Sequence, residues 1–181
     1  ALMMGSGVGA ERGILIRSGE AIQTFKDVKV MVLDKTGTIT RGEPKLTDVV
    51  PADGVSETEL LELATAVENA SEHPIARAIV DGARERGIKP GNVVDFRSTG
   101  ARGVSGRVGE STVLIGNRLL LEEQGVNGLE ALDKSLSDLE DQGRTAVIVA
   151  RDGKAYGIVA VADTLKDESV AAIRAMHEQG L

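Results

Sequence analysis

The feature that most constrains the fold is a short apolar run, residues 28–34, that ends in the carboxylate of Asp34. A valine- and leucine-rich run of this length is typical of a buried parallel strand. The next residues, Lys35-Thr36-Gly37-Thr38, would form a loop at the carboxyl end of that strand. Open α/β sheets place their ligands at this edge. The sequence therefore predicts an α/β domain with a functional carboxylate at the end of one strand.

Helical patterns follow after Pro44. Residues 56–59, Ser-Glu-Thr-Glu, form a capping box, and apolar residues at helical spacing then predict a helix to about Ala70. Pro74 is well placed in the first turn of a second helix, which we expect to continue to about Glu85.

Strand patterns dominate the second half. Residues 92–116 are rich in Gly and Val and predict antiparallel strands joined by tight turns. A helix is predicted from about Leu129 to Gln142, followed by a hairpin over residues 145–161 with its turn at Asp152-Gly153. A last helix is expected from about Lys166 to Gln179.

These elements predict two kinds of domain in one chain. An α+β segment, residues 46–158, with an antiparallel sheet flanked by helices, would be inserted into an α/β domain. Residues 1–45 and 159–181 would supply that outer domain, which we expect to be incomplete because a parallel sheet normally has about five strands. The abrupt ends, and the lack of any run near the roughly 20 apolar residues of a membrane span, predict a loop cut out of a larger protein.

The string from Asp34 to Thr40, Asp-Lys-Thr-Gly-Thr-Ile-Thr, is the most specific motif. A single aspartate that ends a strand is usually a capping or turn residue, but the full string resembles the phosphorylation motif of the P-type ATPases, within the haloacid-dehalogenase-like superfamily. The resemblance implies that Asp34 attacks the γ-phosphorus of ATP and forms an acyl phosphate, which divides one difficult hydrolysis into two steps.

The same resemblance implies roles for the neighbouring residues. An Asp34 oxygen and the main-chain carbonyl of Thr36 would ligate Mg²⁺, which balances the charge spread over the phosphoryl oxygens. Lys35 and Thr38 would order the loop and the phosphate, although Lys35 could equally be a solvated surface charge. Related phosphatases carry an acid where Thr36 stands, and a hydroxyl is a poor base near neutral pH. The aspartyl phosphate should therefore last long enough to drive a conformational change, which favours a pump over a phosphatase.

A second motif, residues 68–74, is Glu-Asn-Ala-Ser-Glu-His-Pro. A single histidine is more often structural, but this one directly precedes a proline, which favours extended geometry. The string resembles the Ser-Glu-His-Pro element in the nucleotide-binding domain of heavy-metal (P1B) pumps. The resemblance implies that Glu68 and His73 hold the adenine, and we also expect Glu72 at the nucleotide.

Two glycine elements complete the predicted nucleotide site. Residues 99–104, Thr-Gly-Ala-Arg-Gly-Val, resemble a Gly-x-Gly-Val pattern of the same family, in which glycines let the backbone approach a ligand closely. This chain departs from the pattern, because Ala101 stands where the first glycine is expected. We predict nucleotide contacts from Ala101, Gly103 and Val104. Gly116-Asn117 also matches an element of the family's pocket, although a turn with a helix cap explains it nearly as well.

Composition limits the partners. The net charge of −7 and the aromatic content of 2% argue against nucleic acid, because a duplex binder needs a basic face and a single-strand binder needs stacking platforms. An acidic chain that binds ATP needs a cation, which favours Mg²⁺. The absence of cysteine excludes disulfides and thiolate metal sites.

The resemblance covers essentially the whole chain and implies the cytoplasmic ATP-binding loop of a P1B pump in the plasma membrane. The transported ion, with monovalent copper ahead of Zn²⁺ or Cd²⁺, would be bound by membrane helices elsewhere in the same polypeptide, which also carries an actuator domain. Later family motifs for phosphate and Mg²⁺ do not occur here, so we expect the chain alone to bind ATP but phosphorylate weakly, if at all. A nucleotide-binding module without catalysis is the alternative.

Overall fold

The computed structural model describes residues 2–25 and 27–181, without the side chains of residues 2–4, 21, 22, 25 and 101. The chain divides into two compact units. One unit comprises the residues up to Lys35 together with Lys166–Leu181, and the other comprises Thr36–Leu165.

The first unit contains helices α1 (Leu2–Glu11), α2 (Gly19–Phe25) and α7 (Ser169–Glu178). Helix α7 confirms the predicted last helix, although it starts later than Lys166. The predicted strand over residues 28–34 is wrong in this structure, because no described strand pairs with it and its valines are exposed, Val32 by 91%. A strand is stable only when a neighbouring strand satisfies its backbone groups, and an apolar run alone does not supply that neighbour.

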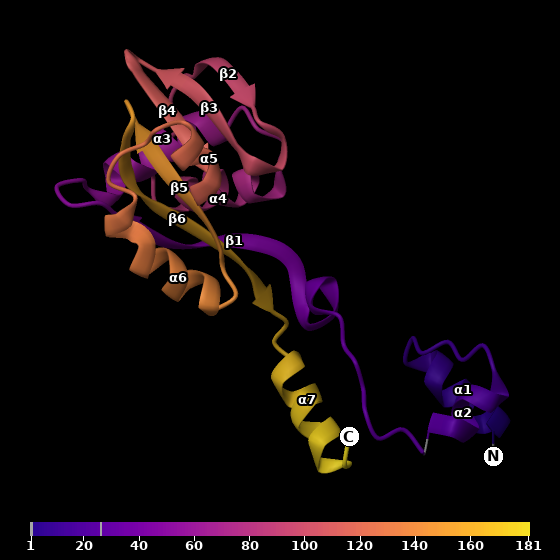
Figure 1. The fold of residues 1–181 in the computed structure, drawn as a ribbon. Helices are drawn as coiled ribbons and strands as arrows, with labels where there is room; N and C mark the ends of the chain where they lie inside the picture. Colours follow the sequence, from indigo (N-terminus) through magenta and orange to yellow (C-terminus); the bar gives the residue numbers. More distant parts are fainter. Residues whose placement is uncertain (1, 26) are drawn as a thin grey trace. The chain divides into compact units, whose positions relative to one another are not determined.

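The second unit is built on a six-stranded antiparallel sheet with the order β1-β6-β5-β4-β3-β2 (Figure 1). This sheet confirms the predicted antiparallel α+β architecture. The strand bounds are as follows: β1 (Thr40–Pro51), β2 (Val94–Ser98), β3 (Gly103–Val108), β4 (Ser111–Gly116), β5 (Thr145–Arg151) and β6 (Lys154–Leu165).

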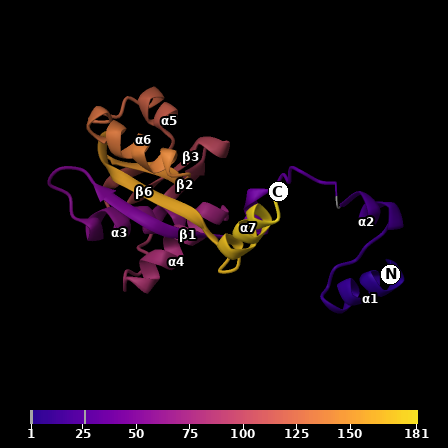
Figure 2. The ribbon, with the colours of Figure 1, turned by 90° about the horizontal axis from the view of Figure 1, so that it is seen from below.

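Helices cover both faces of this sheet (Figure 2). Helices α3 (Glu57–Glu68) and α4 (Pro74–Glu85) pack on one face, and α5 (Arg118–Glu123) and α6 (Asp133–Asp141) pack on the other. The alternation along β6 explains the two layers: Val159 and Val161 belong to the core under α3 and α4, whereas Ile158 and Ala160 belong to the core under α5 and α6. Three short turns, η1 (Lys35–Ile39), η2 (Gly100–Arg102) and η3 (Glu130–Leu132), complete the elements.

Local signals place the helix starts and the hairpin. Ser56 and Glu59 form the predicted capping box at the start of α3. Pro74 is the first residue of α4, with His73 as its N-cap. The β5–β6 hairpin turns at Asp152-Gly153, where both residues have positive φ.

Strand β1 was not predicted from the sequence. It contains Pro44 and Pro51 and has register shifts against β6 between Thr40 and Pro44 and between Leu46 and Asp48. Proline is tolerated here because β1 lies at the edge of the sheet. Strands β1 and β6 run through the predicted domain boundaries near residues 45 and 158, and the predicted three-part division stays a prediction.

Candidate functional site

A pocket of 200 Å³ opens at one end of the antiparallel sheet of the second unit. It is formed by the α3–α4 connection, the start of α4, the η2 turn with β3, the end of β4 and the start of β5. Its lining residues are Glu68, Ser71, His73, Ile75, Ala76, Ser98, Gly100, Arg102, Gly103, Val104, Ile115, Gly116, Asn117, Thr145, Ala146 and Val147.

The pocket brings together most of the predicted nucleotide-binding residues. Those that line it are Glu68, His73, Gly103, Val104, Gly116 and Asn117. Glu72 is exposed and is not part of the lining, and the side chain of Ala101 lies outside the described part of the chain. The structure thus gathers residues from three separate sequence motifs, while their contact with a nucleotide stays a prediction.

Glu68 is the buried acid of the pocket. It is the last residue of α3 and is only 6% exposed. Among the described residues, none forms a hydrogen bond or an ion pair with its carboxyl group, and burial raises the pKa of Glu68 to about 7. A carboxyl group poised near neutral pH can donate or accept a hydrogen bond, so it suits a ligand with both donors and acceptors.

His73 has a fixed orientation at the start of α4. Its Nδ1 accepts a hydrogen bond from the backbone N–H of Ile75 at 3.2 Å, and its own backbone N–H donates to the Ser71 hydroxyl at 3.3 Å. Because Nδ1 is an acceptor, the neutral ring carries its proton on Nε2. That N–H leaves His73 with a donor to offer to a ligand in the pocket.

Gly103 and Gly116 make a close backbone contact in the pocket wall. They face each other across strands β3 and β4. A Cβ on Gly103 would lie 2.2 Å from the backbone oxygen of Ile115, and a Cβ on Gly116 would lie 2.5 Å from the backbone oxygen of Arg102. The two glycines are thus required by the close approach of two backbones, which gives them a structural role whatever the ligand.

Asn117 caps helix α5. Its side-chain oxygen accepts from the backbone N–H of Leu120 at 3.0 Å, and its backbone N–H donates to the backbone oxygen of Arg102 at 3.0 Å. The helix-cap explanation of Gly116-Asn117 is therefore confirmed, and the side-chain N–H₂ is the group that could serve a ligand.

Sequence reasoning missed the pocket residues contributed by β2 and β5, such as Ser98 and Thr145. Thr145 begins the predicted hairpin, but only the sheet order places β5 next to β4 and therefore next to Gly116. No local signal marked either residue as part of a site.

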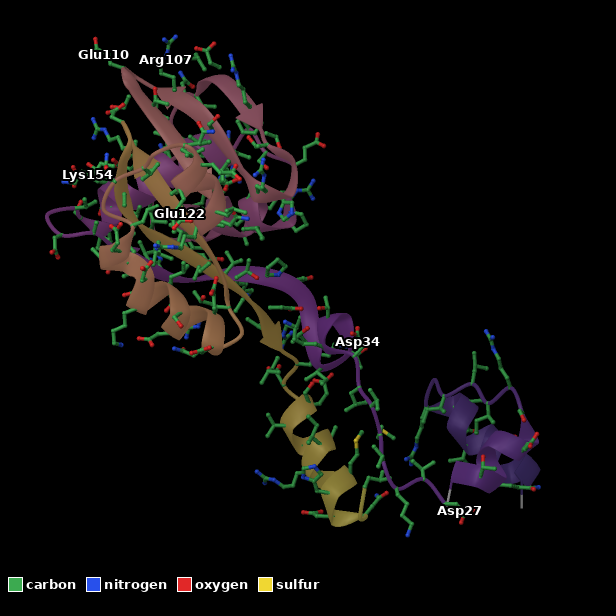
Figure 3. All side chains as sticks on the ribbon, in the orientation of Figure 1. Asp27, Asp34, Arg107, Glu110, Glu122 and Lys154 are labelled. Atoms are coloured by element: carbon green, nitrogen blue, oxygen red, sulfur yellow. The ribbon has the colours of Figure 1, made fainter. Side chains whose placement is uncertain are left out.

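The predicted phosphorylation motif, residues 34–40, crosses the boundary between the two units. Asp34 is exposed and ends the extended segment just before η1 (Figure 3). Asp34 and Lys35 belong to the first unit, whereas Thr36 and Thr38 belong to the second and are exposed. Asp34 therefore belongs to a different compact unit from the residues of the pocket.

Asp163 anchors the part of this motif that lies in the second unit. One carboxylate oxygen accepts from the buried Thr40 hydroxyl, and the other accepts from the backbone N–H groups of Gly42 at 2.9 Å and Glu43 at 3.2 Å. The Thr40 hydroxyl in turn accepts from the N–H of Gly37 at 3.3 Å. A chain of hydrogen bonds therefore runs from β6 into the turn that follows Asp34.

The donors at the motif suit Mg²⁺ chemically. Mg²⁺ takes hard oxygen ligands and commonly keeps several waters beside one or two carboxylates and a phosphate. The exposed Asp34 carboxylate and the backbone carbonyl of Thr36 are donors of this kind. In the described part of the chain no three acidic, histidine or cysteine side chains cluster as a metal site.

A comparison with protein families gives the class. The chain belongs to the haloacid dehalogenase-like hydrolases, whose family model matches residues 28–181. The fold class expected from the sequence is thereby confirmed.

More specific relatives are P-type ATPases. The chain is 41% identical over 180 residues to a copper-transporting P-type ATPase of Rhizobium leguminosarum bv. viciae and 42% identical over 181 residues to a probable copper-exporting P-type ATPase of Archaeoglobus fulgidus. These alignments cover 99% and 100% of this chain but 21% and 22% of the relatives. The chain thus spans about a fifth of the length of the proteins it matches, and it is homologous to P-type ATPases over that part.

Solved structures agree. A zinc-transporting PIB-type ATPase in the E2.Pi state matches with a TM-score of 0.83 at 35% identity, over 99% of this chain and 29% of that chain. The N-domain of HMA6, a copper-transporting P-type ATPase, matches with a TM-score of 0.56 at 25% identity, over 66% of this chain and 99% of that chain. Among the described helices none has the length and apolar character of a membrane span.

Proposed function

We propose that this chain is the ATP-binding and phosphorylation-site region of a P-type ATPase that exports a heavy-metal ion, monovalent copper in the first instance. The observation that carries the proposal is the pocket, which unites Glu68, His73 and Gly103 from three motifs in a chain that also bears the Asp34 motif.

The pocket suits the base of the nucleotide. Its volume of 200 Å³ lies below the roughly 300–1,000 Å³ of pockets that enclose a drug-sized ligand, so it has room for a ring system but not for a whole nucleotide. Val104 and Ile115 provide apolar walls, and Glu68 and His73 provide the polar groups. An adenine ring, which is flat and has donors and acceptors on its edge, matches this lining.

Phosphoryl transfer would occur at Asp34. A carboxylate oxygen of Asp34 forms a bond to the γ-phosphorus while the bond to the β–γ bridging oxygen breaks and ADP leaves. Mg²⁺ bound there would neutralise charge on the phosphoryl oxygens. Thr36 supplies a backbone oxygen but no acid for rapid hydrolysis, so the aspartyl phosphate persists and can drive a change in the membrane part of the protein.

The relatives support a choice of transported ion. The curated relatives named above transport or export copper, whereas one solved neighbour transports zinc at lower identity. We therefore place monovalent copper first and Zn²⁺ second. The chain would work on the cytoplasmic side of the plasma membrane, joined to membrane and actuator domains of the same polypeptide.

Two measurements test this function. Titration of the chain with ATP should shift the His73 ring resonance, and ATP binding without any shift would contradict the adenine assignment. In the intact protein, acid-stable ³²P labelling from ATP should vanish in Asp34→Asn. A label that persists in this variant would rule out the aspartyl-phosphate mechanism.

A further inference from the structure

Arg102 is a basic residue with a fixed backbone in the pocket wall. Its backbone N–H donates to Thr99 O at 3.3 Å, and its backbone oxygen accepts from Asn117 N at 3.0 Å. Arg102 is also the only lysine or arginine among the described residues that line the pocket. In a chain with a net charge of −7, this position is where an anionic part of a ligand would find a cation.

The guanidinium of Arg102 is already paired. Its Nη1 lies 2.7 Å from Oε2 of Glu123, the last residue of α5. Both side chains are 45% exposed, so the ion pair lies at the surface and not in the pocket floor. Exposed ion pairs of this kind are worth little, roughly 0–1 kcal/mol, and a stronger anion can displace one partner.

The buried and the exposed residues of the pocket differ in the ligand groups they can hold. Glu68 is buried and has no charged partner among the described residues, whereas His73 and Arg102 are exposed. A polyphosphate could not be desolvated beside that acid, because burying unpaired charge is costly. The phosphates of a nucleotide bound there must remain at the exposed mouth, where Arg102 lies.

We propose that Arg102 recognises the phosphates of the bound nucleotide and that Glu123 competes with them for the same guanidinium. In the absence of nucleotide, the Glu123 carboxylate occupies the guanidinium of Arg102 that a phosphate would otherwise bind. The pair lowers the affinity for nucleotides but not for the base alone. This inference rests on the proposed function, since it takes the base to occupy the pocket.

The chain offers a matched control on the same helix. Glu122, which Figure 3 labels, precedes Glu123 in the sequence of α5 and pairs with Arg118 at 3.1 Å. Arg118 does not line the pocket. Glu122→Gln and Glu123→Gln therefore remove the same charge from the same helix, but only the second releases Arg102.

The test is calorimetric titration of the full chain with ATP, ADP and adenosine at fixed ionic strength without divalent cations. Arg102→Gln should weaken ATP and ADP binding about three- to tenfold and leave adenosine unchanged, because charge-assisted bonds to phosphate are lost. Glu123→Gln should tighten ATP binding about two- to fivefold, whereas Glu122→Gln should have no effect. The double variant Arg102→Gln/Glu123→Gln should bind ATP like Arg102→Gln alone.

The outcomes separate the two proposals. Equal losses of ATP and adenosine binding in Arg102→Gln, or no loss of either, would overturn the role of Arg102. Tightening in Glu122→Gln equal to that in Glu123→Gln would overturn the competition. A wild-type chain that binds neither ATP nor adenosine would instead overturn the proposed function. Arg102→Lys keeps the charge and should retain much of the ATP affinity, which guards against a merely misfolded Arg102→Gln.

Discussion

The proposed nucleotide pocket and the predicted phosphorylation motif are held in place by different interactions. The pocket wall depends on backbone packing, as at Gly103 against Gly116, and it encloses a buried acid, Glu68. Residues 36–38 of the motif are exposed, and hydrogen bonds of the buried Thr40 with Asp163 and Gly37 tether the turn. Base recognition should therefore be a property of this chain by itself, whereas the chemistry at Asp34 has to be followed in the intact protein.

The largest expected effect comes from crowding the pocket wall. In Gly103→Ala the new Cβ would meet backbone atoms that cannot move aside, so the free energy of unfolding should fall by about 3 to 4 kcal/mol and ATP binding should be lost. Urea denaturation followed by circular dichroism measures the first effect. Gly91→Ala is the control, because its Cβ would meet only Ala66 Cβ at 3.4 Å, and a change beyond about 0.5 kcal/mol is not expected there.

The next effect concerns Glu68 and depends on pH. Because burial raises its pKa from 4.5 to about 7 in the folded chain, the folded state favours the protonated carboxyl. This contribution to stability is fully present below about pH 4.5 and is lost as the pH rises through 7. Glu68→Gln, which stays neutral, should therefore be more stable than the wild type by about 2 to 3 kcal/mol at pH 8 and nearly equal to it at pH 4.5.

Thermal or urea unfolding at both pH values measures this difference. Glu72→Gln, in an exposed position of the same connection, should show no pH-dependent gain. A Glu68→Gln variant with the same stability difference at both pH values would show that the ionisation of Glu68 is not the cause.

The smallest effect should come from the tether of the motif. Thr40→Val removes the hydroxyl that bridges Asp163 and Gly37, and should cost about 1 to 2 kcal/mol of unfolding free energy because it leaves a carboxylate oxygen without this partner. Faster hydrogen exchange at the Gly37 amide would report local release of the turn. Thr40→Ser keeps the hydroxyl, and a Ser variant as unstable as the Val variant would contradict the role of these bonds.

Local chemistry in the sequence was enough to place α3, α4 and the last hairpin. The signals are local: Ser56 and Glu59 form a capping box, Pro74 fixes the first turn of α4, and Asp152-Gly153 adopt the positive φ angles of the hairpin turn. Residues 28–34 show the opposite case, since the same apolar pattern forms a strand only where a partner strand exists. Strand β1 was not predicted, because it contains two prolines and its register shifts interrupt the alternation typical of a strand.

The residues of the candidate site divide in the same way between those that local motifs mark and those that only the fold brings together. Glu68, His73 and Gly103 were found through short motifs. Thr145 joins them only because the sheet order carries β5 beside β4, which no spacing along the chain reveals. The pairing of Arg102 with Glu123 likewise depends on the position of α5, a helix too short to predict.

The pairing of β1 with β6, the first and last strands of the second unit, affects how that unit could be exchanged between proteins. Thr40 pairs with Leu165 across β1 and β6, and Asp163 bonds to Thr40 and Gly42, so the unit begins and ends at one place. A module whose two ends meet can be gained, lost or exchanged between proteins without stretching the host chain. We therefore expect that residues 40–165 can be inserted into a surface loop of another protein, or circularly permuted by joining their ends.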